Sequence, residues 1–312
     1  MELLHLVTHR SSFFDRRIRS LRHRGHDCDI VPVPGRELDD RADRVETSRS
    51  VRHYLWFFGR VLAATPNSYD LVHAHYGLTA PFAILQPHGP VVLSLWGSDL
   101  HGEFGWLSER CARLVEETVV MSPEMATQLD CGATVVPHGV DTGLFRPMGR
   151  AAARQAVGWD PATRHVLFPY SPTRTVKNFP LAERVAERVR ADLDCAVRLQ
   201  TVYDVEQDAV PVYMNAADAL LLTSRREGSP NTVKEALACN LPVVATDVGD
   251  VRERVGGVTR SVVCTDEAAM VTALSRILDE NGRSNGRQAI QSLSVEQMAD
   301  RLESVYRRAL DA

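Results

Sequence analysis

The residue types best suited to chemistry in this 312-residue chain stand together in one segment, Leu220–Gly249, which reads as strand, loop, helix and strand. Ser229 is a good N-cap residue, and Pro230 fits the first position of a helix. The backbone N–H groups of Asn231 and Thr232 would then lack partners and be backed by the helix dipole. This arrangement predicts a site for an anion such as a diphosphate.

Two carboxylates flank the predicted anion site. Glu227 stands just before the expected helix, and Glu235 stands inside it, about 7.5 Å along the axis from Pro230. Carboxylates at these positions can accept hydrogen bonds from the hydroxyl groups of a sugar. Two acids beside an anion require compensating cations, which we expect from Arg174 and Lys177.

These two cations stand in the segment Tyr170–Pro180, directly after the expected strand His165–Pro169. They should therefore lie at the same carboxyl edge of a sheet as the predicted anion site. Arg174 offers a planar fork for phosphate oxygens, and Lys177 offers a compact charge. Together they could hold a diphosphate and stabilise the charge that grows as it leaves.

The elements that position these residues follow from the alternation of short apolar runs with helical patterns, which is typical of βαβ units and parallel sheets. The alternation breaks at Pro137–Pro147 and then restarts, so we expect two α/β domains, residues 1–146 and 147–312. The cleft between two such domains is the expected ligand site. The predicted strands are Leu3–Val7, Cys28–Val33, Asp70–Ala74, Val91–Leu95, Thr118–Met121, Ala133–Val136, His165–Pro169, Ala196–Thr201, Ala219–Thr223, Pro242–Thr246 and Ser261–Val263.

Several motifs, in chain order, resemble those of the family 4 glycosyltransferases, which have the GT-B fold. The resemblance covers most of the chain and is strongest from Val136 to Gly249. The motifs are D-L-V-H-A-H-Y-G (Asp70–Gly77), W-G-S-D (Trp96–Asp99), V-P-H-G-V-D (Val136–Asp141, usually P-N-G-V-D), R-T-V-K-N (Arg174–Asn178) and E-x7-E (Glu227–Glu235) with L-P-V-V-A-T-D-V-G after it.

The resemblance implies two Rossmann-like parallel-sheet domains that face a cleft. Residues 1–146 would bind the acceptor, residues 147–312 would bind a nucleotide sugar, and a last helix at about 295–309 would pack back on the first domain. It also implies a retaining hexosyltransferase that uses a nucleotide-diphosphate sugar and needs neither a metal nor another cofactor. Its acceptor would be a glycan, a lipid-linked molecule or a small molecule, in the synthesis of cell-surface polysaccharide or glycoconjugate.

Carried over residue by residue, the resemblance assigns the donor site. Arg174 and Lys177 would bind the donor diphosphate, and Glu227 would contact the transferred sugar near the reacting carbon. Glu235 would hold the ribose hydroxyls. The stretch that touches both sugar and phosphate would be Ser229, Pro230, Asn231 and Thr232.

The acceptor side departs from the family pattern, because many members have histidine where this chain has Trp96. Trp96 would stack on an acceptor ring, and Asp99 would either bind acceptor hydroxyls or cap the segment that follows it. His75 or His101 could act in place of the missing histidine. His73 and His75 share a strand face, but no third histidine or carboxylate stands at ligand spacing, so we expect no metal site.

Two other functions stay open: a nucleotide-sugar epimerase of GT-B fold, and a catalytically silent protein that binds sugar nucleotides. The net charge of −4, from 36 basic and 40 acidic residues, gives no overall field that would recruit nucleic acid. Only two of the basic residues are lysines, Lys177 and Lys234, and we expect Lys234 to be an exposed helix residue.

The sequence shows no signal peptide and no apolar run of the ~18 residues that a spanning helix needs, so we expect a cytoplasmic protein. Two segments leave open a peripheral position at the inner face of the cell membrane. One is the arginine-rich stretch from Arg10 to Arg24, and the other is Tyr54–Phe58, flanked by Arg49, Arg52 and Arg60. The alternative is a solvated basic helix and a core helix.

Overall fold

A computed structural model describes residues 1–35, 49–64 and 69–312 of the chain. The chain forms two compact units: unit 1 contains Met1–Gly139 and Val295–Ala312, and unit 2 contains Val140–Ser294. The division falls after Gly139, whereas the sequence suggested residue 146. The reason is that Val140 already belongs to unit 2, where its N–H donates to the carbonyl of Leu293 at 2.8 Å.

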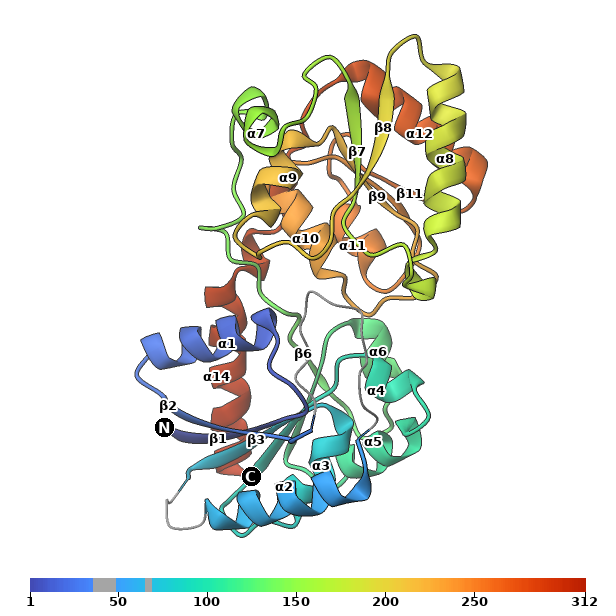
Figure 1. Cartoon of the computed structure of the whole chain (residues 1–312). Coiled ribbons are helices and arrows are strands. Elements are labelled where there is room, and N and C mark those ends of the chain that lie inside the picture. Colours follow the sequence, from blue (N-terminus) through green and yellow to red (C-terminus); the bar gives the residue numbers. More distant parts are fainter. Residues whose placement is uncertain (36–48, 65–68) are drawn as a thin grey trace. The chain divides into compact units, whose positions relative to one another are not determined.

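Unit 1 is built on a parallel sheet with the strand order β2-β1-β3-β4-β5-β6 (Figure 1). Its β1 pairs with β2 on one side and with β3 on the other, so that His5 lies opposite His73. Nearly all residues of β1, β3 and β4 are buried, as expected of parallel strands covered on both faces. The strands are β1 (Glu2–Val7), β2 (Asp27–Pro32), β3 (Leu71–His75), β4 (Val91–Ser94), β5 (Glu117–Val120) and β6 (Thr134–Val135).

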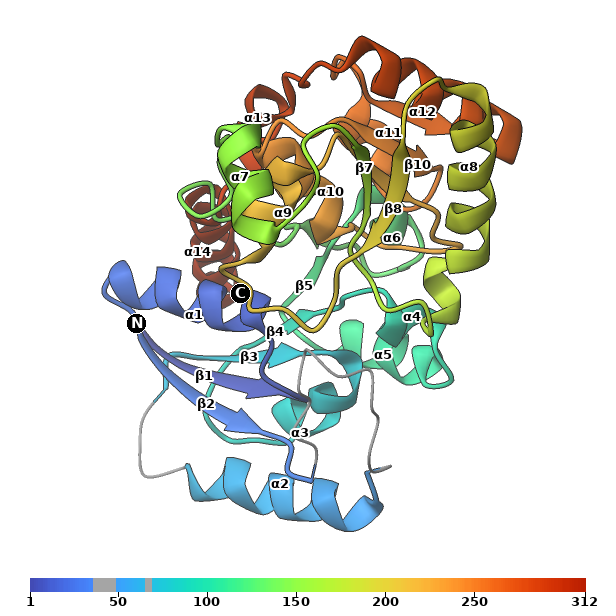
Figure 2. The same ribbon diagram turned by 45° about the horizontal axis from the view of Figure 1, so that its top comes forward.

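The helices of unit 1 cover both faces of this sheet (Figures 1 and 2). The last helix, α14 (Val295–Asp311), lies beside α1 (Ser12–His23) on one face, and α2 (Val51–Ala63) and α3 (Ala80–Ile84) lie on the other. α14 belongs to the core of unit 1, with Leu302, Val305 and Tyr306 fully buried. The shorter helices are α4 (Ser98–His101), α5 (Gly105–Ala112), α6 (Pro123–Thr127) and the 3-10 turn Gly77–Thr79.

Unit 2 has a parallel sheet in the order β11-β10-β9-β7-β8. Helix α8 packs against α12, and α7 packs against α9. The strands are β7 (Arg164–Phe168), β8 (Val197–Thr201), β9 (Ala219–Leu222), β10 (Val243–Thr246) and β11 (Val262–Cys264). The helices are α7 (Arg150–Val157), α8 (Phe179–Asp192), α9 (Val210–Ala216), α10 (Asn231–Ala238), α11 (Val251–Val255), α12 (Glu267–Glu280) and α13 (Gly286–Ala289), with 3-10 turns at Thr175–Lys177 and Gln291–Leu293.

Each of the predicted strands overlaps an observed one, so the α/β class with two parallel sheets is confirmed. The arginine-rich stretch is not simply a solvated basic helix, because Arg16 and Arg17 of α1 are buried. Among the residues that the structure describes, no helix is both long enough and apolar enough to cross a bilayer.

Candidate functional site

The strand order of unit 2 locates its candidate site. β7 lies between β8 and β9, so the connections that leave β7 and β9 run to opposite faces of the sheet. Such a switch point leaves an opening at the carboxyl ends of the two strands, and ligands of parallel sheets bind there. The two segments that follow β7 and β9 are those that contain Arg174 and Lys177, and Glu227.

An ion pair joins these two segments. The Nζ of Lys177 lies 2.5 Å from Oε1 of Glu227, and both side chains are largely buried. Oε1 also accepts a hydrogen bond of 2.7 Å from the hydroxyl of Ser224. The ammonium group stands 4.0 Å from the centre of the Tyr170 ring, in a cation–π contact. Burial lowers the pKa of Lys177, and the carboxylate of Glu227 opposes this shift.

Backbone contacts hold the two segments in register. The hydroxyl of Thr223 donates to the carbonyl of Lys177 at 2.9 Å, and the N–H of Arg225 donates to the carbonyl of Val176 at 2.9 Å. Arg174 is exposed at the start of the same turn. The charge of Lys177 is therefore directed at Glu227, whereas the side chain of Arg174 is exposed.

Helix α10 begins one residue later than the sequence suggested. Asn231 is its first residue and Pro230 takes the N-cap position, so the prediction of Ser229 as N-cap is wrong. The amides of Asn231 and Thr232 nevertheless open the helix, where N–H groups have no partner within it. The hydroxyl of Tyr170 donates to Oγ1 of Thr232 at 2.9 Å, which ties the helix start to the segment after β7.

The loop before α10 rests on two residues to which the sequence gave no role in the site, Gly249 and Asp250. The Oδ2 of Asp250 accepts hydrogen bonds of 2.8 Å from the Ser229 hydroxyl and from Nε of Arg254. Gly249 has a φ of +53°, and a Cβ atom there would lie 2.1 Å from the carbonyl oxygen of Gly228. Glycine is therefore required for this close approach of two loops.

Glu235 lies inside α10 with 5% of its surface exposed, and Nε2 of Gln207 donates to its Oε1 at 3.4 Å. Its neighbour Lys234 is fully buried, so the expectation of an exposed lysine is wrong. The reason is that α10 is enclosed by its own unit, with every residue from Val233 to Ala238 buried.

Unit 1 has the same kind of switch point, between β1 and β3. Asp99, at the carboxyl edge of this sheet, accepts hydrogen bonds from the backbone N–H groups of Trp96 and Gly97, both 2.8 Å, and of Gly77 at 3.2 Å. Burial raises the pKa of Asp99 to about 6. Its carboxylate thus connects the loops after β3 and β4. The alternative that Asp99 caps the segment after it is wrong, because α4 begins at Ser98 without a side-chain cap and the three N–H groups belong to residues that precede Asp99.

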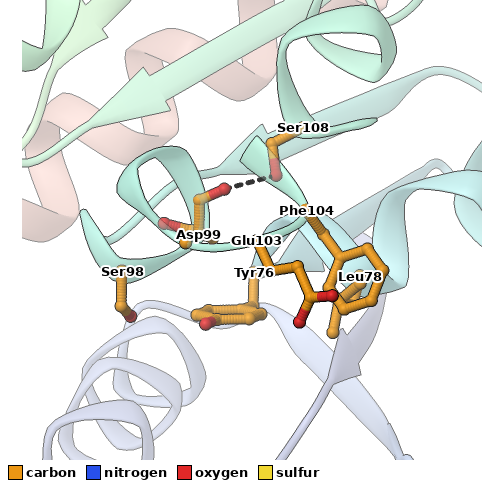
Figure 3. A pocket seen from close by; sticks show the side chains of 8 residues that line it. Tyr76, Leu78, Ser98, Asp99, Glu103, Phe104 and Ser108 are labelled. Atoms are coloured by element: carbon orange, nitrogen blue, oxygen red, sulfur yellow. Dashed lines mark hydrogen bonds between the residues drawn. The ribbon is translucent and has the colours of Figure 1, made fainter. Parts of the chain in front are cut away.

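A small pocket adjoins Asp99. Figure 3 shows the side chains of Tyr76, Leu78, Glu103 and Phe104 gathered around it, with the hydroxyl of Ser108 bonded to the backbone of Asp99. Tyr76 has a φ of +84°, which is strained for a residue other than glycine. Strain of this kind gathers at ligand sites, so the pocket marks this edge of unit 1 as a candidate ligand site.

His75 does not lie open at this edge, because it is fully buried in a cluster with His5 and His73. The third histidine was missed in the sequence because it comes from β1, some 70 residues earlier. His73 bonds to the Tyr306 hydroxyl at 2.7 Å and to the Ser94 hydroxyl at 2.8 Å.

Hydrogen bonds occupy five of the six ring nitrogens of this cluster, and His5 Nε2 is the one without a partner among the described residues. An arginine can only donate, so Nδ1 of His75 accepts from the Arg17 guanidinium at 3.3 Å, and its Nε2 carries the proton. That proton is shared with Nδ1 of His5 at 3.0 Å. As arranged here, the rings and the adjacent guanidinium do not fit a cation.

Trp96 lies where the sequence placed it, at the end of β4, and is partly exposed. Its ring meets the ring of His138 edge to face, with centroids 5.1 Å apart. The ring of His75 lies 6.1 Å away. Of the predicted acceptor-side residues, the structure thus brings Trp96 and Asp99 to one edge and places His75 beneath them.

Comparisons with known proteins agree for both units. The family model described as Glycosyltransferase Family 4 matches residues 13–144, and the one described as Glycosyl transferases group 1 matches residues 179–280. The chain is 28% identical, over 246 residues, to the lipopolysaccharide core biosynthesis mannosyltransferase LpsB of Rhizobium meliloti (strain 1021); the match covers 65% of this chain and 68% of that protein.

Solved structures share the fold over the whole chain. Sucrose-phosphate synthase from Thermosynechococcus elongatus superposes with a TM-score of 0.78 at 17% identity and covers 100% of both chains. Anabaena Alr3699/HepE, in complex with UDP-glucose, superposes with a TM-score of 0.65 at 14% identity and covers 97% of this chain and 98% of that one.

The histidine cluster predicts a loss of stability in acid. Burial lowers the pKa of His5 to about 3 and holds those of His73 and His75 well below their usual range. In the unfolded chain these residues take up protons near pH ~6.5, so the stability that they contribute is present above that pH and is lost below it. Asp99, with its pKa raised, offsets about one proton. We expect a fall of roughly 3 kcal/mol per pH unit between pH ~6 and ~5.

Urea unfolding of the full chain at several pH values measures this slope. His5→Gln should reduce it by about one proton, or ~1.4 kcal/mol per pH unit. His101→Gln, at an exposed position, is the matched control and should leave the slope unchanged. Equal slopes for His5→Gln and the unsubstituted chain would contradict the interpretation.

Proposed function

Because this chain belongs to glycosyltransferase family 4 and has the GT-B fold, we propose that it moves a hexose from a nucleotide-diphosphate sugar to an acceptor with retention of configuration. The acceptor would be a glycan, a lipid-linked molecule or a small molecule in the synthesis of cell-surface polysaccharide or glycoconjugate. The observation that carries the proposal is the meeting of Arg174, Lys177, Glu227 and the start of α10 at one switch point.

In this proposal the donor lies across the carboxyl edge of the unit 2 sheet. The diphosphate binds between Arg174 and Lys177 and the amides of Asn231 and Thr232, with the helix dipole behind them. Glu235 accepts hydrogen bonds from the ribose hydroxyls. Glu227, held by Lys177 and Ser224, is the group placed to meet the transferred sugar.

The proposed transfer breaks the bond between the anomeric carbon and the diphosphate oxygen and forms a bond from the same face to an acceptor oxygen. The acceptor proton passes to an oxygen of the leaving diphosphate. Negative charge grows on that group, and Arg174, Lys177 and the α10 amides are placed to compensate it. These fixed charges are the basis on which we propose catalysis without a metal.

Unit 1 would supply the acceptor site, at the edge that contains Trp96 and the pocket beside Asp99. An epimerase of the same fold would act on the donor alone, so turnover without any acceptor would identify it. A silent binding protein would neither transfer nor hydrolyse the donor sugar. The intact set Arg174, Lys177, Glu227 and Glu235 favours an active enzyme over a silent binding protein.

The donor assignment is tested by thermal shift of the full chain against UDP-, GDP- and ADP-sugars, because a ligand of the native state raises its stability by mass action. Sugars of one of the three nucleotides should raise the unfolding midpoint selectively. Glu235→Ala should weaken the binding of that nucleotide sugar roughly tenfold to a hundredfold by loss of the ribose contacts. The matched control is Glu187→Ala, an exposed acid on α8. No shift with any nucleotide sugar, or no effect of Glu235→Ala, would sink the proposal.

Lys177→Arg should impair turnover by at least tenfold although the charge is kept. The site holds a compact ammonium between the Glu227 carboxylate and the Tyr170 ring, and a planar fork with five N–H groups does not fit there. Lys177→Met, which leaves Glu227 unpaired, should impair it further. Steady-state rates with the selected donor measure both, and near-normal activity of Lys177→Arg would show that charge alone suffices.

Contact with the membrane is proposed through α2, and not through the arginines of α1 that are buried. α2 exposes Val51, Leu55 and Trp56 together with Arg52, and its sequence contains no acid, which suits an anionic lipid surface. Trp56→Ser should reduce sedimentation of the full chain with vesicles that contain phosphatidylglycerol. Trp106→Ser, at a tryptophan of similar exposure on α5, is the control. Equal sedimentation of the two variants would contradict this part of the proposal.

A further inference from the structure

The most unusual charge in unit 1 is Arg17, whose side chain on α1 is fully buried. Its Nη1 donates to Nδ1 of His75 and its Nη2 to Nδ1 of His138, both at 3.3 Å. Both rings accept these bonds and are therefore neutral. The charged guanidinium is thus hydrogen-bonded to two neutral rings and forms no ion pair through these contacts.

No carboxylate in the described part of the chain compensates this charge by an ion pair. Asp15, on the same helix, is paired with Arg10 at 2.8 Å. The carboxylate oxygens of Asp99 accept hydrogen bonds from three backbone N–H groups. Burial lowers the pKa of Arg17, and among the described residues the hydroxyl of Tyr306 on α14 opposes this shift. A buried guanidinium of this kind is costly unless an anion lies nearby.

Buried hydrogen-bond donors near this charge also lack acceptors. In the described residues, neither Nε of Arg17 nor Nε1 of Trp96 has a hydrogen-bond partner. The two side chains are joined through His138, which accepts from Arg17 and meets the Trp96 ring edge to face at 5.1 Å. The ring of Phe13 stacks on the same histidine at 5.9 Å, and the guanidinium of Arg16 stands 4.8 Å from the centre of the Phe13 ring.

The position of this group in the fold is that of a ligand site. Trp96 follows β4 and His138 follows β6, both at the carboxyl edge, while Arg17 reaches His75 at the end of β3. The charge of Arg17 and the two unpartnered N–H donors lie at this edge, beside the switch point between β1 and β3.

We propose that this edge of unit 1 binds an anionic oxygen group, a phosphate or a carboxylate, that is attracted by the charge of Arg17. Nε1 of Trp96 is covered in the structure, so the partly exposed indole ring turns to bring its N–H to the anion. The group would belong to the acceptor, so this inference rests on the proposed function. It makes Trp96 a specificity-determining residue that selects an anionic acceptor over a neutral one. Arg17 is a positioning residue that acts through His138 and through its charge.

The test separates this site from the donor site. Arg174→Gln with Lys177→Met first weakens phosphate binding in unit 2, and inorganic phosphate is then titrated against the full-length double variant by thermal shift and calorimetry at constant ionic strength. Adding Trp96→Phe, which keeps the ring and removes the N–H group, should weaken phosphate binding at least tenfold. Arg17→Met should abolish it. Arg19→Gln, at an exposed position of the same helix, should change nothing.

Phosphate binding that is the same with and without Trp96→Phe would overturn the proposal, and this variant keeps the test valid even if Arg17→Met does not fold. A second arm compares a sugar phosphate with its parent sugar as acceptor for the chain with its donor site intact. Trp96→Phe should raise KM at least tenfold for the sugar phosphate alone, and equal effects on both acceptors would also overturn it.

The outcomes separate the two proposals and the two sources of the anion. Phosphate binding that depends on Trp96 in a chain without transfer activity would support the anion site and overturn the proposed function. Inorganic phosphate that competes with the sugar phosphate for transfer would support a single subsite for both. Phosphate that binds without competing would show a site for the free ion and overturn its assignment to the acceptor.

Discussion

The arrangement of both units depends on one constraint of parallel sheets: two neighbouring strands whose outgoing connections diverge leave an opening at their carboxyl ends. β7 and β9 form such a pair in unit 2, and β1 and β3 form one in unit 1. In unit 2 the opening brings together Arg174, Lys177 and Glu227 from segments about 50 residues apart. The chemistry of each unit therefore follows from strand order, because the order decides which loops meet.

The two switch points differ in how they treat buried charge. In unit 2 the ammonium of Lys177 lies against the carboxylate of Glu227, so this buried charge has an ionised partner of opposite sign. In unit 1 the guanidinium of Arg17 is bonded to two neutral imidazole rings. Desolvation of an ion is offset only by a partner of opposite charge or by well-formed hydrogen bonds. Unit 2 has such a partner in its own chain, and unit 1 lacks one among its described residues.

Local patterns were sufficient to predict the strands, the two-unit α/β architecture and the two segments that meet at the switch point of unit 2. Periodicity and the spacing of Glu227, Glu235, Arg174 and Lys177 are properties of contiguous sequence, which is why they could be read. Asp250 and His5 could not be assigned roles, because their hydrogen-bond partners are distant in sequence. Asp250 accepts from Ser229 in the loop before α10, and His5 of β1 bonds to His75 of β3. The burial of Lys234 escaped prediction for the same reason, since the packing around α10 decides it.

The burial of both lysines gives a physical reason for lysine at position 177 in a chain that otherwise uses arginine. The chain has 36 basic residues and uses lysine at only two positions, yet both lysines are buried while many arginines lie at the surface. A guanidinium presents five N–H groups in a fixed plane, and a buried site must satisfy them all. The space between Glu227 and the Tyr170 ring offers one carboxylate and one aromatic face, which a compact ammonium can satisfy. The shape of this site thus explains the lysine at position 177. Arg17 illustrates the alternative, because this buried guanidinium leaves its Nε–H without a hydrogen-bond acceptor among the described residues.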